Sequence, residues 1–227
     1  MVDQQDLSLE ITYVGDPMCS WCWGFAPVVE KIDDSFDIPV RTIIGGLRPG
    51  DSAEPIDRIR PMLEHHWNQV AAVSGQPFDL GGLDRTDWMY DTLVADTAVV
   101  TMRSAAPAET LRFLATVQRA FYAERIDVTD PDVYPDLVAD FPVDPDAFCE
   151  ALRSPEMSAA TEQDFLESRW LGVSGFPTLL LRDGATAVPI SVGYAPFERV
   201  AERINGFIEK NHPEAADGLV CDIDGAC

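Results

Sequence analysis

Two of the five cysteines, Cys19 and Cys22, are separated by two residues and lie at the junction of a predicted strand and a predicted helix. Apolar residues that alternate with polar ones predict the strand, and apolar residues three or four positions apart predict the helix. The predicted elements are a strand over 7–14, a helix from 19 or 20 to about 35 and a second strand over 38–44. The first part of the chain is therefore a β-α-β unit with a dithiol at its first strand-to-helix turn.

A dithiol at the start of a helix suits thiol–disulfide exchange. Free N–H groups and the helix dipole stabilise negative charge there, so the first cysteine forms a thiolate more readily. We assign Cys19 as the nucleophile and Cys22 as the thiol that resolves a mixed disulfide one turn later. The alternatives are a structural disulfide or half of a zinc site, which needs two more ligands. Cys149 or a histidine could supply these, but no second CxxC occurs, and the context favours redox chemistry.

A second motif lies far along the chain, at Ser174-Gly175-Phe176-Pro177-Thr178, before the apolar run Leu179–Leu181. A proline at the mouth of a central strand cannot donate to the ladder. It is either a plain strand-entry proline or a cis-proline, which would expose the preceding backbone to an extended peptide.

These motifs carry a family resemblance. The run 175–181 resembles the cis-proline strand of thioredoxins, and Pro27 falls where thioredoxins kink the active-site helix. The helical pattern from Ser52 to about Trp170 resembles the DsbA family. Within it, residues 16–25 and 45–50 are similar to the FrnE-like branch of predicted cytosolic protein-disulfide isomerases.

The resemblance implies an α/β thioredoxin fold, β-α-β then β-β-α, with a large all-helical insertion. It also implies a cis bond at Pro177 and a loop, with Phe176, that holds substrate against Cys19. Trp21 is expected to shape the mouth of the site and to offer apolar surface. The expected divisions are the first half of the fold (1–50), the insertion (51–172), the second half (173–212) and an acidic tail (213–227).

The composition narrows the choice of partners. The chain has 39 acidic and 16 basic residues and a formal charge of -23. Such a surface repels phosphate backbones and anionic lipid, so we expect neither nucleic acid nor membrane as a partner. The acidity indicates either a GC-rich genome or a high-salt cytosol. No run approaches the roughly 20 apolar residues of a membrane span, and the start lacks the pattern of a signal peptide. We therefore expect a cytoplasmic protein.

Other residues are secondary candidates. Asp16 could relay a proton, although a turn or N-cap role is the favoured interpretation. His65 and His66 are interpreted as structural or surface residues, with one of them lining the cleft as the alternative. Gly45-Gly46 either ends a strand or allows a close backbone approach, and Cys149 is expected to be a buried small hydrophobe.

Two further cysteines, Cys221 and Cys227, lie in the acidic tail. They could form a second dithiol that exchanges electrons with Cys19 and Cys22. The alternatives are a metal clip that uses Asp222 and Asp224, or incidental thiols.

The leading hypothesis is a thiol–disulfide oxidoreductase or isomerase acting on protein or peptide disulfides, with an unidentified redox donor or acceptor and no cofactor or metal. The Ser20-Trp21 dipeptide lacks the histidine of periplasmic DsbA proteins, so we expect a milder potential suited to reduction or isomerisation. The runner-up is a thiol-cofactor-dependent enzyme resembling 2-hydroxychromene-2-carboxylate isomerase or kappa-class glutathione transferase. Those enzymes usually carry serine where Cys19 stands. A third hypothesis is a binding module with a redox switch.

Overall fold

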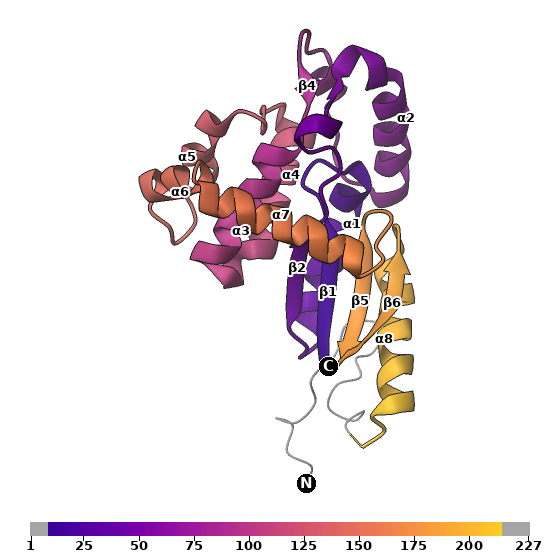
Figure 1. Cartoon of the computed structure of the whole chain (residues 1–227). Helices are drawn as coiled ribbons and strands as arrows, with labels where there is room; N and C mark the ends of the chain where they lie inside the picture. The colour runs from indigo at the N-terminus through magenta and orange to yellow at the C-terminus, as the bar shows by residue number, and fades with distance from the viewer. Residues whose placement is uncertain (1–8, 215–227) are drawn as a thin grey trace.

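A four-stranded sheet forms the base of the molecule (Figure 1). The computed structural model describes residues 9–214. The strands are β1 (Leu9–Gly15), β2 (Val40–Ile44), β5 (Thr178–Asp183) and β6 (Thr186–Val192), in the order β2-β1-β5-β6. The β1–β2 pair is parallel, whereas β5 runs antiparallel to both β1 and β6. This arrangement confirms the predicted thioredoxin fold.

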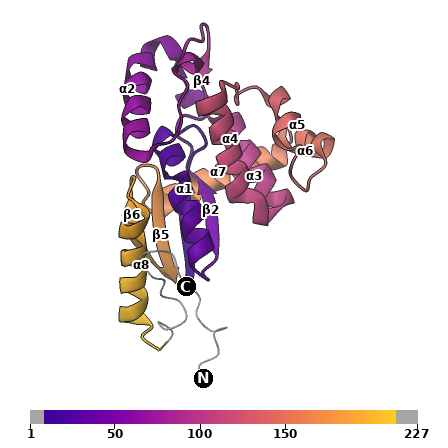
Figure 2. The ribbon, with the colours of Figure 1, turned by 180° about the vertical axis from the view of Figure 1, so that it is seen from behind.

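Helices cover both faces of the sheet. Figures 1 and 2 show α1 (Ser20–Ser35) and α8 (Phe197–Asn211) on one face and α7 (Pro155–Trp170) across the other. The spacing of Phe197, Val200, Ile204 and Ile208 predicts an amphipathic helix, and α8 buries all four side chains. β1 is covered on both faces, and six of its seven residues are buried. Burial on both sides explains why apolar residues dominate this strand.

The insertion between β2 and β5 is mainly helical. Besides α7, its helices are α2 (Ile56–Ser74), α3 (Leu93–Ala105), α4 (Thr110–Glu124), α5 (Tyr134–Leu137) and α6 (Pro145–Leu152). The sequence predicts either a kink or a restart of the helix at Pro61. No restart occurs, because α2 continues through this proline.

The prediction of an all-helical insertion is wrong in one detail. Two short strands, β3 (Glu54–Pro55) and β4 (Met89–Tyr90), pair antiparallel beside α2. They form because the segment that leaves α2 returns alongside the segment that enters it. Strands of two residues are too short to show an alternation in the sequence, so no pattern could have predicted them.

The strand ends differ slightly from expectation. β2 begins at Val40 rather than Ile38, directly after Pro39. The sequence predicts a last strand over 188–192; β6 begins two residues earlier, at Thr186, and contains Pro189 beside a register shift. This proline is tolerated because β6 is the edge strand. Within residues 9–214, no helix is long and apolar enough to cross a membrane.

Candidate active site

Cys19 and Cys22 lie where β1 delivers the chain to α1. Cys19 is the N-cap residue of α1, and its carbonyl accepts hydrogen bonds from the N–H groups of Cys22 (2.9 Å) and Trp23 (3.1 Å). Both thiols are free. No acidic residue lies in the first turn, so nothing there opposes the positive end of the helix dipole. The position suits a thiolate at Cys19.

The two thiols differ in burial, and Cys22 is the more deeply buried of the two. Cys19 retains 7% of its surface, whereas Cys22 retains none. Burial, followed by the neighbouring Cys19 thiol, raises the pKa of Cys22 well above its ordinary value. A substrate sulfur can therefore reach Cys19, and Cys22 stays protonated beneath it. This difference matches the roles predicted for a nucleophile and a resolving thiol.

The second motif lies against the first. The peptide bond between Phe176 and Pro177 is cis, as predicted. The Cys19 thiol donates to the Phe176 carbonyl at 3.7 Å, across 157 positions in the sequence. Pro177 is buried, and its carbonyl accepts from the Gly193 N–H at 2.7 Å. The loop thus presents backbone directly beside the reactive sulfur.

Gly45 leaves space for the ring of Phe176. A Cβ at Gly45 would overlap the Cε1 atom of this ring, so a larger residue there would have to displace the ring. Gly46 has a φ of +73°, and a Cβ there would lie 2.8 Å from the Phe165 ring. Both interpretations of Gly45-Gly46 are therefore partly correct. The pair directly follows the end of β2, and its backbone is closely approached by aromatic rings of the same chain.

Asp16 is fully buried beneath the turn between β1 and α1. Its Oδ1 accepts from the Met18 N–H at 2.8 Å, and its Oδ2 accepts from the Leu47 N–H at 2.6 Å. The turn role is thus correct. The N-cap role is wrong, because Cys19 occupies that position. Burial raises the pKa of Asp16 to about 6, although the two N–H groups act in the opposite direction.

A second buried carboxyl, Asp96 on α3, lies near Asp16 and was not predicted. Its Oδ2 accepts from the Thr92 hydroxyl at 2.7 Å. Burial, and then the negative charge of Asp16, raise the pKa of Asp96 well above its ordinary value. Asp96 therefore holds its proton while Asp16 ionises. Nothing in the local pattern of α3 distinguishes this aspartate from a solvated one.

The raised pKa of Asp16 predicts a pH-dependent stability. In the folded protein Asp16 keeps its proton up to about pH 6, whereas in the unfolded chain this carboxyl loses its proton above pH 3.8. The free energy of unfolding therefore falls as the pH rises from 3.8 to about 6. Between pH 4.5 and 7 the free energy of unfolding of the wild type should fall by about 2 kcal/mol relative to Asp16→Asn. Urea unfolding across this range measures the difference. Asp37→Asn, at an exposed position, is the control and should follow the wild type.

The cleft over Cys19 has a volume of about 520 Å³ and no acidic lining residue. Trp21, Arg48, His66, Arg169 and Phe176 are among its walls. In a chain with 39 acidic residues, a cleft that carries arginine and no carboxylate differs in charge from the rest of the protein and favours anionic ligands. The favoured interpretation of the histidines is wrong for His66, which lines the cleft, and the two arginines were given no role from the sequence. A role for these residues can be recognised only when α2 and α7 are placed around the dithiol.

The remaining candidates lie elsewhere. Trp23 belongs to the core, where its Nε1 donates to the Pro77 carbonyl at 3.0 Å. Cys149 is buried in the insertion, as expected. His65 is exposed. Cys221 and Cys227 lie outside the described residues. Among residues 9–214, no group of three or more His, Cys, Asp or Glu side chains is arranged to hold a metal ion.

Comparison with known proteins identifies the family. The sequence profile of the DSBA-like thioredoxin domain matches residues 10–205. The chain belongs to this family. The predicted membership of the DsbA family is therefore confirmed, and with it the interrupted thioredoxin fold.

Several solved structures resemble this DSBA-like protein. A candidate protein disulfide isomerase from Nitrosomonas europaea is 31% identical, with a TM-score of 0.82 over 89% of this chain and 98% of the other. The cytosolic disulfide reductase DsbM from Pseudomonas aeruginosa is 24% identical, with a TM-score of 0.76 over 91% and 100%. Among curated proteins, the ClpXP adapter protein SpxH of Shouchella clausii is 23% identical over 93% of this chain and 72% of that protein.

Proposed function

We propose that this DSBA-like protein is a thiol–disulfide oxidoreductase that acts on protein or peptide disulfides through Cys19 and Cys22. The observation that carries the proposal is the contact of the Cys19 thiol with the Phe176 carbonyl, 3.7 Å away, above a fully buried Cys22. An extended substrate that pairs with the loop would bring its sulfur to Cys19. The roles of Trp21, Phe176 and Pro177 in binding are part of this proposal.

The exchange proceeds in two balanced steps. The Cys19 thiolate attacks one sulfur of the substrate disulfide, and the other sulfur leaves as a thiolate that takes up a proton. Cys22 then loses its proton and attacks the Cys19 sulfur, which releases the second substrate thiol. The substrate disulfide is reduced by two electrons, and the dithiol becomes the Cys19–Cys22 disulfide.

Asp16 is the base that we propose for the second step. Cys22 is too weak an acid to ionise unaided, because burial raises its pKa. The pKa of Asp16, about 6, makes the carboxylate the main form at neutral pH while leaving it more basic than an exposed aspartate. The proton of Cys22 therefore passes to Asp16, directly or through water.

Trapping tests the proposal. Cys22→Ser lacks the resolving thiol, so mixed disulfides with substrate should accumulate on Cys19 and be visible by non-reducing electrophoresis and mass spectrometry. The double variant Cys19→Ser/Cys22→Ser is the matched control and should trap nothing. If Cys22→Ser traps no more than this control, the proposed exchange at Cys19 is wrong.

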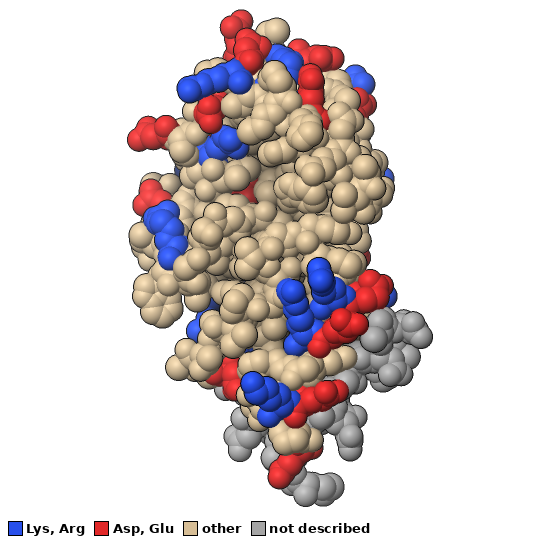
Figure 3. Space-filling model, turned by 90° about the vertical axis from the view of Figure 1, so that its right-hand side faces the viewer, with Lys and Arg blue, Asp and Glu red and all other residues tan. Residues whose placement is uncertain are grey.

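The surface near the cleft supports a protein substrate. Figure 3 shows the side of the molecule that carries α2 and β6, where an uncharged band separates charged regions above and below. Met62, which lines the cleft, is 36% exposed, and Trp170, the residue after the lining residue Arg169 in the sequence, is 82% exposed. Apolar side chains around a reactive thiol suit unfolded or partly folded chains, whose apolar segments are accessible. We propose reduction or isomerisation as the direction, because Ser20 and Trp21 bring no charge to stabilise the thiolate.

A small anionic thiol is the second candidate substrate, as the reductant of the disulfide form. Arg48, Arg169 and His66 line a cleft without carboxylates, which suits the two carboxylates of glutathione. DsbM from Pseudomonas aeruginosa, at 25% identity and a TM-score of 0.71, has a solved structure with GSH. Two glutathione molecules would reduce Cys19–Cys22 and leave as glutathione disulfide. The intact dithiol favours this reaction over the transferase or isomerase chemistry of the runner-up.

Arg169→Gln tests the glutathione step. Arg169 is exposed and forms no ion pair within the described residues, so its loss should raise the KM for glutathione only about threefold. The KM for 2-mercaptoethanol, which has no charge, should not change. Arg199→Gln removes an equally exposed charge from α8, away from the cleft, and should affect neither thiol. Equal effects on both thiols in Arg169→Gln would contradict a role in binding carboxylates.

The similarity to SpxH raises a binding function as an alternative, since that protein is named as an adapter. The free dithiol beside the cis-proline loop favours the redox function. We also propose that the protein acts in the cytoplasm, because the similar DsbM is described as a cytosolic disulfide reductase.

A further inference from the structure

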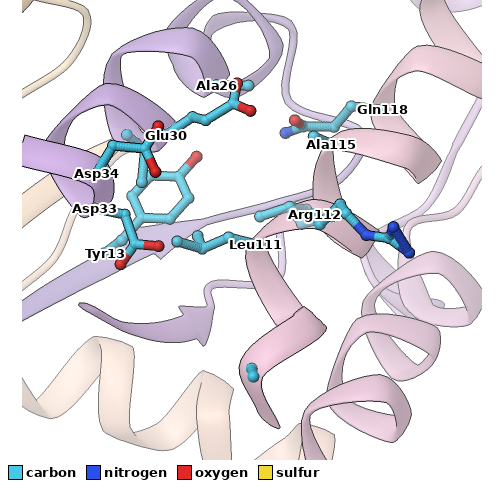
Figure 4. Close-up of a pocket in the computed structure, with 12 residues that line it drawn as sticks. Tyr13, Ala26, Glu30, Asp33, Asp34, Leu111, Arg112, Ala115 and Gln118 are labelled. Atoms are coloured by element: carbon cyan, nitrogen blue, oxygen red, sulfur yellow. The ribbon is translucent and has the colours of Figure 1, made fainter. Parts of the chain in front are cut away.

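A second cavity lies behind the active-site helix, between α1 and α4. Its volume is about 220 Å³, and Tyr13 of β1 forms part of its wall (Figure 4). It shares no lining residue with the cleft over Cys19. Nothing in the proposed redox mechanism uses this space.

Gln118 of α4 is the main reason to regard the cavity as a binding site. The side chain is fully buried, and neither its Oε1 nor its Nε2 atom has a hydrogen-bond partner within residues 9–214. Figure 4 shows its carboxamide directed into the space between the two helices. A buried amide without partners destabilises a protein unless something else satisfies it.

Tyr13 presents a second polar group. It is 1% exposed, and its hydroxyl lies beside the Cys22 thiol, with no other polar partner among the described residues. Burial, and then the nearby Cys22 thiol, raise its pKa well above the ordinary value, so the hydroxyl stays protonated. The inner part of the cavity thus offers a hydroxyl and an amide, while Ala26, Val29 and Leu114 add apolar walls.

The mouth of the cavity is negative. Glu30, Asp33 and Asp34 of α1 line it, and none of the three forms an ion pair within the described residues. Burial and the charge of Asp34 raise the pKa of Asp33, as expected for carboxylates without a counter-ion.

The one basic lining residue does not neutralise this charge. The Arg112 guanidinium donates to Glu109 (2.8 Å) and to the Asp140 carbonyl (2.8 Å), and it lies over the Phe141 ring at 4.0 Å. Figure 4 shows it pointing away from Tyr13 and Gln118. The carboxylates therefore remain available to a ligand.

We propose that this cavity binds a small organic cation that also carries a neutral polar group, such as an amino alcohol. The ammonium group lies among the carboxylates of α1, and the hydroxyl, which both donates and accepts, pairs with Gln118 and Tyr13. The volume of about 220 Å³ equals that of about seven water molecules, so a chain of a few carbons fits. Water alone would satisfy the amide and would hydrate the three exposed carboxylates, but it would not balance their negative charge at the mouth of the cavity.

Calorimetric titration of the full chain with matched probes tests the site. 5-Aminopentan-1-ol has both groups, 1,5-pentanediol lacks the charge, and pentylamine lacks the hydroxyl. We expect one bound 5-aminopentan-1-ol per chain and weaker binding of the other two. Gln118→Met, of similar volume, should weaken the amino alcohol about fivefold by removing its hydrogen bonds, but should leave pentylamine unchanged.

Charge variants separate a defined site from general attraction to an acidic protein. Glu30→Gln should weaken both amines about threefold, whereas Asp37→Asn, an exposed residue that does not line the cavity, should weaken neither. Equal effects of Glu30→Gln and Asp37→Asn would overturn the proposal, as would unchanged amino-alcohol binding in Gln118→Met. If no probe binds at millimolar concentration, the cavity holds only water and the proposal is wrong. None of these outcomes depends on the redox function.

Discussion

Replacing Cys19 with serine should abolish disulfide reduction. A hydroxyl at this position does not ionise near neutral pH, so the attacking thiolate is lost, and the buried Cys22 cannot replace it. The rate of insulin reduction, followed by turbidity with a chemical or enzymatic reductant, should fall at least about 10³-fold, as for other covalent catalysts without their nucleophile. Stability should change little, because Cys19 already retains some solvent contact and serine is smaller.

The matched control is Cys149→Ala. Cys149 is also a free, buried cysteine, but it lies on α6 of the insertion. Its substitution should cost some stability through a small cavity and leave turnover unchanged. If Cys19→Ser reduced insulin as fast as the wild type, Cys19 would not be the nucleophile. If the wild type itself reduced no insulin, a binding role like that in the name of SpxH would become the better hypothesis. Binding of a partner would survive the substitution of Cys19.

Adding one methyl group at Gly45 should disturb the site strongly. The Cβ of Gly45→Ala would overlap the Phe176 ring, so this ring must leave its place beside the cleft. Overpacking of this kind costs about 1–3 kcal/mol of stability. We expect that loss in urea unfolding, together with a raised KM for a protein disulfide, because the displaced ring alters the loop that adjoins Cys19.

Two further variants show whether the clash is the cause. Gly175→Ala lies in the same loop, where a Cβ meets nothing within 4 Å, and should be nearly silent. Phe176→Ala removes the ring, so Gly45→Ala added to it should cost less than it does alone. If the two substitutions are additive, the contact between Gly45 and Phe176 does not limit the position of the loop.

Local patterns predicted the parts of the site that adjoin each other in the chain. The junction of β1 and α1 places Cys19 and Cys22 one turn apart, whatever the rest of the chain does. The cis bond at Pro177 followed from the resemblance of residues 175–181 to thioredoxins. The family resemblance and the hydrophobic periodicity together also predicted the family, the order of strands and helices, and the buried face of α8.

Residues whose role depends on distant segments were missed or misjudged. His66 and Arg169 come from α2 and α7, and only the packing of these helices places both on one cleft. Asp96 resembles a solvated helix residue in the sequence, but its burial beside Asp16 gives the pair its raised pKa values. The strands β3 and β4 exist only because two segments meet.

The sequence alone thus determined the first β-α-β unit and its dithiol, because these depend on backbone preferences and on periodicity within a short stretch. The complete fold and the cis-proline loop were also predictable, because short motifs of the chain resemble those of a known family. The tertiary structure decided how these parts meet: Cys19 contacts a carbonyl 157 positions away, and Asp16 and Cys22 lose their water. It also decided that a strongly acidic chain has a cleft without carboxylates. Desolvation and electrostatic energy depend on distances between segments that are remote in the chain, and no local pattern records those distances.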